Sequence, residues 1–133
     1  MTASLTLSVR TPDGLLYDGV VRSIRAEDRD GGFGVLPGRR DLAAVLPPSL
    51  LLFEDEDGDG YVAVSSAVLE LTAGRCRVMA PEAALARDPD DAARSLSRLR
   101  EIRTDAVARR RGVIADLERE VLRRLAHAMR EDR

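Results

Sequence analysis

The chain has 133 residues, 44% hydrophobic and 33% charged, which is the composition of an ordinary soluble protein built as one compact domain. A net charge of −2 excludes a global basic field that would attract nucleic acid or an anionic membrane, and 3% aromatic residues argue against a surface that stacks bases. Cys76 is the single cysteine, so an internal disulfide is excluded. The lone cysteine fits a reducing cytoplasm. The first ten residues lack the apolar run of a secretory signal, and no run approaches the ~20 residues that span a bilayer, so we expect neither a signal peptide nor a membrane span.

Residues 1–87 contain short extended segments separated by turns. Leu5–Val9 alternates apolar and polar residues, which predicts a half-buried strand, and Thr11–Gly14 has the composition of a turn. In chain order, the predicted strands and extended segments are Leu5–Val9, Leu15–Tyr17, Val20–Ala26, Phe33–Leu36, Leu50–Glu54, Tyr61–Ser65, Val68–Leu71 and Arg75–Ala80. Leu42–Leu46 is an apolar segment that ends at Pro47-Pro48. Asp18-Gly19 is expected to end the second of them, and Asp55–Gly60 to form a hairpin turn. Short strands with no helix between them predict an all-β fold, either an antiparallel β-sandwich or a barrel.

Residues 88–133 have a helical period instead. Proline and acidic residues at Asp88–Asp91 are typical of a helix start. An apolar stripe follows at Ala92, Leu96, Leu99, Ile102, Ile114, Leu117, Val121, Leu125 and Ala128. Breaks at Thr104 and Gly112 favour a helical hairpin, and one long bent helix is the alternative. Asp105–Arg109 and Glu120–Arg124 are spaced as i,i+4 ion pairs.

The charge distribution supports the same division. Residues 1–89 carry 9 Arg and 14 acidic residues, whereas residues 90–133 carry 12 Arg and 9 acidic residues. We therefore expect a mainly β domain at 1–87 followed by a basic helical tail at 88–133.

Two glycine-containing segments resemble ligand motifs in part. Asp55, Asp57, Asp59 and Gly60 match the first half of a calcium-binding loop, but position 66 is Ser where the bidentate Glu is required, so a solvated hairpin turn is favoured. The glycines from Gly31 onward resemble a dinucleotide fingerprint, but no helix follows to hold a pyrophosphate, so a tight turn is favoured.

The remaining reactive side chains do not form a catalytic set. His127 is the single histidine and has no ligand or nucleophile partner at a suitable spacing. Cys76 shares a strand face with Val78 and Ala80, which favours a buried, inert thiol, although Arg75 and Arg77 leave a lowered pKa open. We therefore predict no catalytic residue, no metal site and no cofactor.

A motif in the fourth predicted strand resembles a known family. Residues 31–38 read Gly-Gly-Phe-Gly-Val-Leu-Pro-Gly, which resembles the Gly-x-x-Gly-(Ile/Val)-x-Pro-Gly-His motif of the epsilon subunits of F-type ATP synthases. Leu5–Gly19 resembles the opening segment of these subunits, and Val64–Leu71 resembles their (Leu/Val)-Ser-Gly-Gly-(Ile/Phe)-Leu-Glu-Val segment. Val78–Asp91 resembles the end of their sandwich and the start of the tail.

Several positions depart from the family pattern. Arg39 stands where the family has His, and Asp41 where it has Pro. The other departures are Gly32 for an acidic residue, Pro48-Ser49 for Pro-Gly and Ser66-Ala67 for a glycine pair. Together with the tail sequence Leu122–Ala126, they resemble the alternate, N-type F-ATPases.

The resemblance implies a non-catalytic subunit of a bacterial central stalk, peripheral to the cytoplasmic face of the plasma membrane. Its partners would be the gamma subunit, the c-ring and the alpha–beta hexamer, with no nucleic acid and no insertion into the membrane. The implied c-ring contact residues are Gly31, Gly32, Phe33, Gly34, Pro37, Gly38, Arg39, Arg40 and Asp41. The implied tail contacts with the hexamer, through which the tail would restrain ATP hydrolysis, are Arg109, Arg110, Arg111, Arg119, Arg123 and Arg124.

Three other interpretations remain open at this point. The arginines of the tail can equally form a solvated helix face. Some members of the family bind ATP through (Ile/Leu)-Asp-x-x-Arg-Ala, but residues 90–95 break this motif in either register, so nucleotide sensing is disfavoured. An unrelated sandwich adaptor with a helical tail would have the same fold, and only its partners would distinguish it.

Overall fold

The computed structural model describes residues 3–102, 119–124 and 126. The described residues contain ten strands and two helical segments, at 89–102 and at 119–124 with 126. The strands are β1 (Leu5–Thr11), β2 (Gly14–Val21), β3 (Ser23–Asp28), β4 (Gly31–Val35), β5 (Leu42–Leu46), β6 (Ser49–Asp55), β7 (Gly58–Val64), β8 (Ala67–Thr72), β9 (Arg75–Met79) and β10 (Ala83–Ala86).

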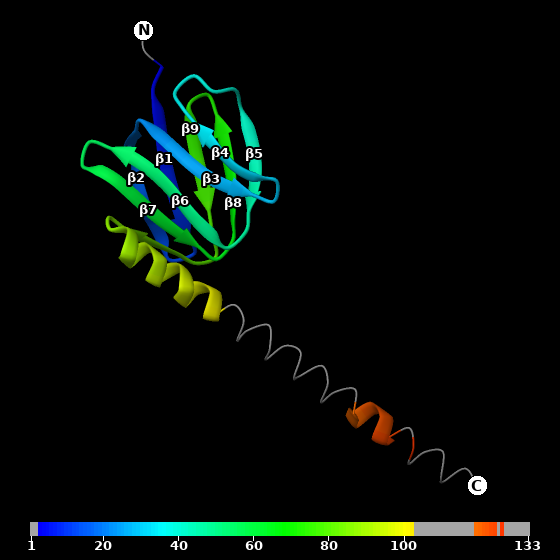
Figure 1. Cartoon of the computed structure of the whole chain (residues 1–133). Coiled ribbons are helices and arrows are strands. Elements are labelled where there is room, and N and C mark those ends of the chain that lie inside the picture. The colour runs from blue at the N-terminus through cyan, green and yellow to red at the C-terminus, as the bar shows by residue number, and fades with distance from the viewer. Residues whose placement is uncertain (1–2, 103–118, 125, 127–133) are drawn as a thin grey trace. The chain divides into compact units, whose positions relative to one another are not determined.

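Two five-stranded sheets face each other, as the sequence predicts (Figure 1). The first sheet has the order β2-β1-β9-β8-β5 and the second the order β10-β7-β6-β3-β4. Side chains alternate between the interior and the outside along each strand, so that Leu5, Leu7 and Val9 of β1 are buried while Arg10 is exposed. The core is almost entirely Leu, Val, Ile and Ala from the two inner faces, and Phe53 is its one fully buried aromatic residue among those described.

One strand pair departs from the antiparallel pattern. β1 and β9 run parallel, with Thr6 opposite Arg75 and Val9 opposite Val78. β1 lies at the beginning of the sandwich sequence and β9 near its end. Their pairing is therefore a long-range contact that local sequence patterns do not predict.

The predicted break at Asp18-Gly19 is wrong, because β2 continues through both residues. Gly19 lies opposite Leu7 in the ladder. A Cβ atom at Gly19 would lie 2.9 Å from the hydroxyl of Tyr17, so the glycine makes room for the Tyr17 ring instead of ending the strand.

The single strand predicted at Val20–Ala26 is also wrong. Val21 ends β2 in the first sheet, and Ser23 begins β3 in the second. At the crossing, the backbone N–H of Arg22 donates to the carbonyl of Glu54 at 2.7 Å. The alternating segment Val20–Ala26 therefore passes from the first sheet to the second at Arg22.

β10 was not predicted, since its sequence, Ala-Ala-Leu-Ala, has little β-propensity. It pairs antiparallel with β7, with Ala83 opposite Val64. The pairing with an exposed sheet edge, a tertiary interaction, makes this segment a strand.

The helix predicted from Asp88 begins at Pro89. The Asp88 carboxylate accepts the N–H of Asp91 at 3.2 Å, which is an N-cap, and the Asp88 carbonyl accepts the N–H of Ala92 at 3.0 Å. Ala92 and Leu99 of the predicted apolar stripe are buried.

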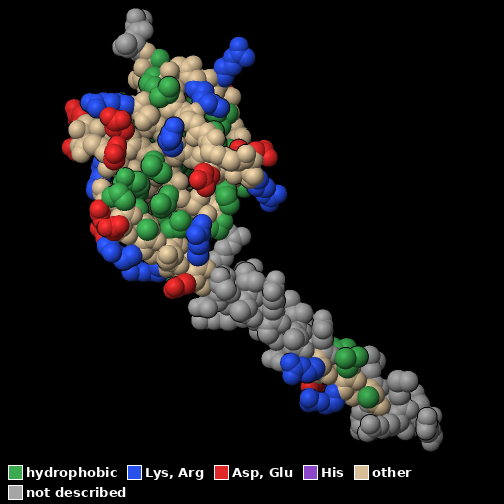
Figure 2. Space-filling model, viewed as in Figure 1, with side chains coloured by type: hydrophobic (Ala, Val, Ile, Leu, Met, Phe, Trp, Pro, Cys, Tyr) green, Lys and Arg blue, Asp and Glu red, His purple; other side chains and the backbone are tan. Residues whose placement is uncertain are grey.

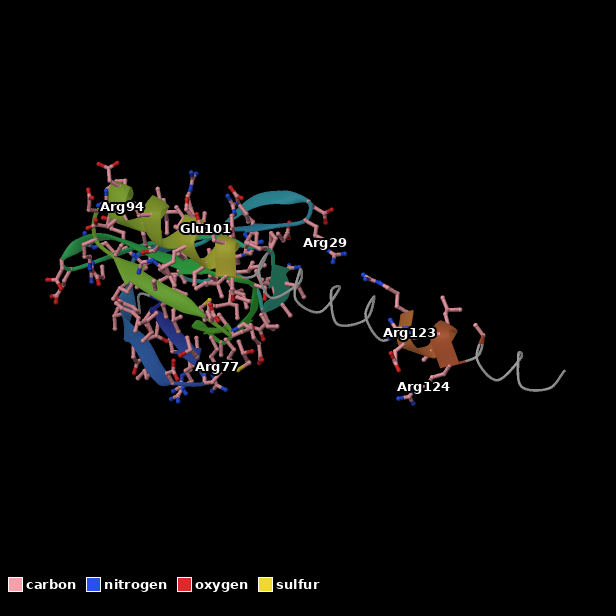
Figure 3. All side chains as sticks on the ribbon, turned by 90° about the horizontal axis from the view of Figure 1, so that it is seen from below. Arg29, Arg77, Arg94, Glu101, Arg123 and Arg124 are labelled. Carbon is pink, nitrogen blue, oxygen red and sulfur yellow. The ribbon has the colours of Figure 1, made fainter. Side chains whose placement is uncertain are left out.

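This helix lies on the outer side of the second sheet. Ala63 of β7 points away from the core, opposite to its neighbours Val62 and Val64, yet it is buried. Arg100 donates to the carbonyl of Pro48, at the start of β6, at 3.3 Å. Figure 3 shows Arg94 of the helix and Arg77 of β9 on opposite sides of the sandwich.

Residues 1–100 form one compact unit and residues 101–133 a second. In the second unit, the described helical segment contains Glu120 paired with Arg123 at 3.3 Å and with Arg124 at 3.2 Å, as the i,i+4 spacing predicts for the latter. The choice between a hairpin and a bent helix, the pair Asp105–Arg109 and the proposed breaks at Thr104 and Gly112 lie outside the described residues. In the described part of the chain, no helix has the length and apolar composition needed to cross a bilayer.

Candidate functional site

The motif at residues 31–41 forms one continuous surface at an edge of the sandwich. Its first part is β4, the edge strand of the second sheet, and its second part, residues 36–41, crosses to β5 at the edge of the first sheet. Of the nine motif residues named above, Phe33 is half-buried and the other eight are exposed. The structure therefore brings the predicted set together.

Two hydrogen bonds hold this loop in place. The Arg39 side chain donates through Nη1 to the carbonyl of Gly34 at 2.6 Å, and Asp41 Oδ1 accepts the N–H of Ala73 at 2.9 Å. Gly38 has a φ of +88°, which a residue with a side chain rarely adopts. The loop is therefore shaped by its own residues and presents Leu36 and Arg40 to the outside.

The outer face of the first sheet has a row of apolar side chains that the described residues leave uncovered. Val45 of β5 lies opposite Val68 of β8, and Val68 lies opposite Met79 of β9. Met79 is next to Arg10, which in turn lies opposite Leu15. The four apolar residues are 63%, 46%, 51% and 50% exposed, and Arg10 interrupts the row between Met79 and Leu15. They form an exposed, mainly apolar band across the sheet, of the kind that marks an interaction surface.

A cluster of polar and aromatic side chains joins the two sheets to the start of the helix. Asp55, at the end of β6, is 7% exposed and accepts two hydrogen bonds from the Arg87 guanidinium, both at 2.9 Å. It also accepts the hydroxyl of Tyr17 at 2.7 Å and the backbone N–H of Asp57 at 2.9 Å. The Phe53 ring lies 4.4 Å from the Tyr17 ring and 5.3 Å from the Arg87 guanidinium carbon. We name these four side chains, Tyr17, Phe53, Asp55 and Arg87, the clamp.

The clamp changes the ionisation of its members. Hydrogen bonds from Arg87 and then from Tyr17 hold the pKa of Asp55 well below its usual range. Burial, together with the hydrogen bond to Asp55, raises the pKa of Tyr17 to about 12. Arg87 has its pKa raised by the same pairing. The clamp therefore stays charged on Asp55 and Arg87 and neutral on Tyr17 through the physiological range.

Sequence reasoning did not find the clamp, because its members come from three separate segments. The only local signal was an arginine directly before a predicted helix start, and an arginine there is unremarkable in a chain whose cations are all arginine. The clamp binds the segment leading into the helix to the sandwich two residues before the helix begins.

The hairpin reading of Asp55–Gly60 is confirmed, and the turn is tighter than expected. β6 ends at Asp55 and β7 begins at Gly58, so only Glu56 and Asp57 connect them. The Asp55 carboxylate, the first oxygen donor of the calcium-like pattern, is instead occupied by Arg87 and Tyr17. The described residues contain no group of three or more possible metal ligands.

Cys76 lies on β9 with Val78 on the same inner face, as predicted, and both are buried. Burial raises the pKa of the Cys76 thiol to about 12. The neighbouring arginines do not lower it, because they point to the opposite face of the strand. The thiol is therefore inert in the folded protein.

The arginines predicted for the tail are only partly described. Arg109, Arg110, Arg111 and the single histidine, His127, lie outside the described residues. Arg123 and Arg124 are exposed and share Glu120, and Arg119 lies one residue before it. In the first helix, Arg94 pairs with Asp91, so these two members of the broken ATP motif bind each other.

Comparison with known proteins identifies the sandwich. Residues 4–86, more than half of the chain, match the family model described as "ATP synthase, Delta/Epsilon chain, beta-sandwich domain". A curated relative from Cereibacter sphaeroides, "ATP synthase epsilon chain 2", is 43% identical over 91 residues, which cover 63% of this chain and 62% of that protein.

Two solved structures share the fold. A chain of the Euglena gracilis mitochondrial ATP synthase (OSCP/F1/c-ring) matches with a TM-score of 0.59 at 22% identity, covering 74% of this chain and 64% of that one. A chain of the Tetrahymena thermophila mitochondrial ATP synthase central stalk/c-ring matches with a TM-score of 0.51 at 18% identity, covering 62% of this chain and 67% of that one. The match to the Cereibacter relative spans less than two thirds of that protein's length. On the match to its sandwich, the chain belongs to the ATP synthase delta/epsilon family.

Proposed function

We propose that the protein is a non-catalytic rotor subunit of the central stalk of a bacterial F-type ATP synthase, coupling the gamma subunit and the c-ring to the catalytic hexamer. The observation that carries this proposal is a family sandwich with two separate exposed surfaces, the loop at 31–41 and the apolar band of the first sheet. A part that transmits torque needs a rigid body with two adhesive surfaces and no active site. The similar structures are chains of ATP synthase complexes that contain the central stalk or the c-ring.

The c-ring contact is assigned to the exposed edge and loop. Its members are the nine residues Gly31, Gly32, Phe33, Gly34, Pro37, Gly38, Arg39, Arg40 and Asp41. Leu36 and Arg40 project from a loop that Arg39 and Asp41 hold in shape, so polar loops of a ring meet a preformed surface.

The gamma contact is assigned to the outer face of the first sheet. Val45, Val68, Met79 and Leu15 form an apolar band there, and a stable partner covers such a band. Arg10 lies within the band and Arg77 next to it, so a complementary partner carries carboxylates at the margin.

The tail is assigned to regulation. The sandwich domain is assigned to residues 1–87 and the basic tail to residues 88–133. In this proposal, the arginines at 109–111, 119, 123 and 124 contact acidic surface of the hexamer and restrain ATP hydrolysis. We expect no ATP binding by the tail, because the sequence around Asp91 and Arg94 breaks the ATP motif of the family in either register. The complex lies on the cytoplasmic face of the plasma membrane and belongs to the N-type subgroup, which fits a relative named epsilon chain 2.

Co-purification tests this function. The chain, tagged at its N-terminus and expressed from its own genome, is expected to retain gamma, c, alpha and beta subunits together. Capture of the chain with none of these subunits would reject the rotor role and favour a separate adaptor. Loss of c alone, with gamma retained, would reject only the assignment of the c-ring surface.

A further inference from the structure

Two buried polar side chains of the sandwich bind the segment that leads into the helix. Among the described residues, the buried polar or charged ones are Ser49, Asp55 and Ser65. Ser65 binds the backbone of Glu82, directly before β10. Asp55 binds the side chain of Arg87, directly after β10. A buried polar group costs free energy unless it is hydrogen-bonded, so its place at each end of one short strand calls for a reason.

The first of these fastenings is a set of three hydrogen bonds between Ser65 and Glu82. The backbone N–H of Ser65 donates to the Glu82 carbonyl at 3.1 Å, and the Ser65 hydroxyl donates to the same carbonyl at 3.2 Å. The backbone N–H of Glu82 donates to the Ser65 hydroxyl oxygen at 3.3 Å. Because Ala83 lies opposite Val64, these bonds extend the pairing of β10 with β7 by one residue.

The second fastening is the clamp. The Arg87 guanidinium donates two hydrogen bonds of 2.9 Å to the Asp55 carboxylate and lies 5.3 Å from the centre of the Phe53 ring. The Asp55 carboxylate is buried and also accepts the Tyr17 hydroxyl at 2.7 Å. A two-bond arginine–carboxylate pair with one partner buried is stronger than an exposed ion pair.

β10 by itself is a weak strand. It has four residues, Ala-Ala-Leu-Ala, at an edge of the second sheet, and alanine has little β-propensity. None of the four is fully buried, so the strand places no side chain in the core. A short edge strand of this kind opens easily, so the two fastenings determine how firmly it stays paired with β7.

The helix that follows β10 has few buried contacts with the sandwich. Among residues 89–102, all of which are described, only Ala92 and Leu99 are buried, and Arg100 donates to the Pro48 carbonyl at 3.3 Å. Figure 2 shows hydrophobic side chains gathered over β6 and β7, in the sheet that also contains β10. An element held by two buried side chains opens at a lower free energy than the core strands do.

We propose that the clamp is a stop for the opening of this part of the chain. When the helix at 89–102 leaves the sheet, the clamp keeps β10 paired with β7, and the opening ends at Arg87. Without the clamp, β10 opens together with the helix. Tyr17, Asp55 and Arg87 are therefore positioning residues, which fix the boundary between the permanent sandwich and the part that leaves it. This boundary lies inside the compact unit of residues 1–100 and involves no partner chain.

Native-state hydrogen exchange of the full chain in low urea tests the stop. The amides of β10 and of Ser65 are the probes, and their rates are taken relative to Leu7 in β1, so that a general loss of stability cancels. Leu99→Asp places a charge at a buried position of the helix and is expected to remove the protection of the helix amides only. Arg87→Ala in the Leu99→Asp background is expected to make the probe amides exchange at least tenfold faster.

Two further variants separate the clamp from charge in general. Arg22 pairs with Glu54, the residue before Asp55, at 3.2 Å on the exposed surface, so Arg22→Ala in the Leu99→Asp background is the matched control and leaves the probe amides unchanged. Arg87→Lys keeps the charge but not the two parallel hydrogen bonds, and is expected to give an intermediate rate.

Two results would overturn the stop. The first is loss of protection in β10 when Leu99→Asp is made with the clamp intact, since β10 would then open with the helix in any case. The second is unchanged protection of β10 when Arg87→Ala is added, since the clamp would then hold nothing. Both measurements use this chain alone, so their outcome does not depend on the rotor role.

Discussion

At the scale of single residues, the position of the Phe53 ring depends on Gly60 having no side chain. They lie opposite each other in the β6–β7 ladder, and the Phe53 ring occupies the place where a Gly60 side chain would be. The Tyr17 ring and the Arg87 guanidinium also contact the Phe53 ring, which limits its movement. A pairing of this kind makes a glycine essential in the middle of a strand.

The first prediction compares two glycine substitutions. Gly60→Ala is expected to lower the free energy of unfolding by about 1–3 kcal/mol, because its methyl group overlaps the Phe53 ring. Gly32→Ala has room for its methyl group and is expected to raise the free energy of unfolding by about 0.5–1 kcal/mol. Urea denaturation measures both values. Equal effects at the two positions would show that backbone entropy, and not the ring, decides the cost.

The second prediction concerns alkaline pH. Burial, together with the hydrogen bond to Asp55, raises the pKa of Tyr17 from its usual 10.0 to about 12, so folding favours its neutral form. This contribution to stability is fully present below pH 10 and is lost as the pH rises from about 10 to about 12. The wild type is therefore expected to lose stability over this interval more steeply than Tyr17→Phe.

The measurement for Tyr17 is a difference titration. Tyrosinate absorbance of the wild type minus that of Tyr17→Phe isolates this residue from Tyr61, and its midpoint is expected near pH 12. A midpoint near 10 would show that the Tyr17 hydroxyl is neither buried nor hydrogen-bonded to Asp55 in solution.

At the scale of elements, the start of the first helix is defined by its cap and by the clamp. Asp88 accepts an N–H of the first turn, and Arg87 binds Asp55 directly before it. Two adjacent side chains therefore fix where the helix starts, while the burial of Ala92 and Leu99 holds it along the sheet. If the tail changes position while the clamp stays intact, the chain has to bend at a residue after Asp88.

The third prediction tests the cap. Asp88→Ala is expected to destabilise the helix by about 0.5–2 kcal/mol, because the N–H of Asp91 loses its acceptor. Asp90→Ala removes an acidic residue from the same turn without removing a cap, and is expected to cost about 0.3–1 kcal/mol. Hydrogen exchange of the amides of Asp91 and Ala92 reports the difference. Identical protection in the two variants would mean that charge alone stabilises this end.

At the scale of the whole molecule, the first helix belongs to the same compact unit as the sandwich. Residues 1–100 form one unit, although the helical sequence begins at residue 89. The burial of Ala63, Ala92 and Leu99 explains this, since the helix covers apolar surface of the second sheet. The boundary predicted between residues 87 and 88 follows the change of sequence period. That this boundary separates two functional parts stays a prediction.

The fourth prediction separates the two parts of the tail. Deletion of residues 101–133 is expected to leave the melting temperature of the sandwich unchanged, because the buried part of the helix remains. Deletion of residues 89–133 is expected to lower it by several degrees, because Ala63 and its surroundings become exposed. Differential scanning calorimetry gives both values.

In the assembled enzyme, both truncations are expected to raise ATP hydrolysis while assembly persists. If only the longer deletion raised hydrolysis, the restraint would lie in the first helix and not in the arginines at 109–111, 119, 123 and 124. Failure to assemble after the shorter deletion would make the tail structural.

The sequence by itself determined the sandwich, the start of the helix and the family motif. These depend on local patterns: alternation in strands such as Leu5–Val9, the Asp88-Pro89 signal, and the spacing of residues 31–38. Each pattern acts over a few residues, so it can be read without knowing what lies across the core.

Only the tertiary structure decided where Val20–Ala26 divides between the sheets, that Ala83–Ala86 is a strand, and that Tyr17, Asp55 and Arg87 meet. It also distinguished Gly32 from Gly60, because the reason for a glycine lies in what occupies the space beside it. These features depend on contacts between residues far apart in the chain, and burial and pairing at those contacts outweigh local propensity.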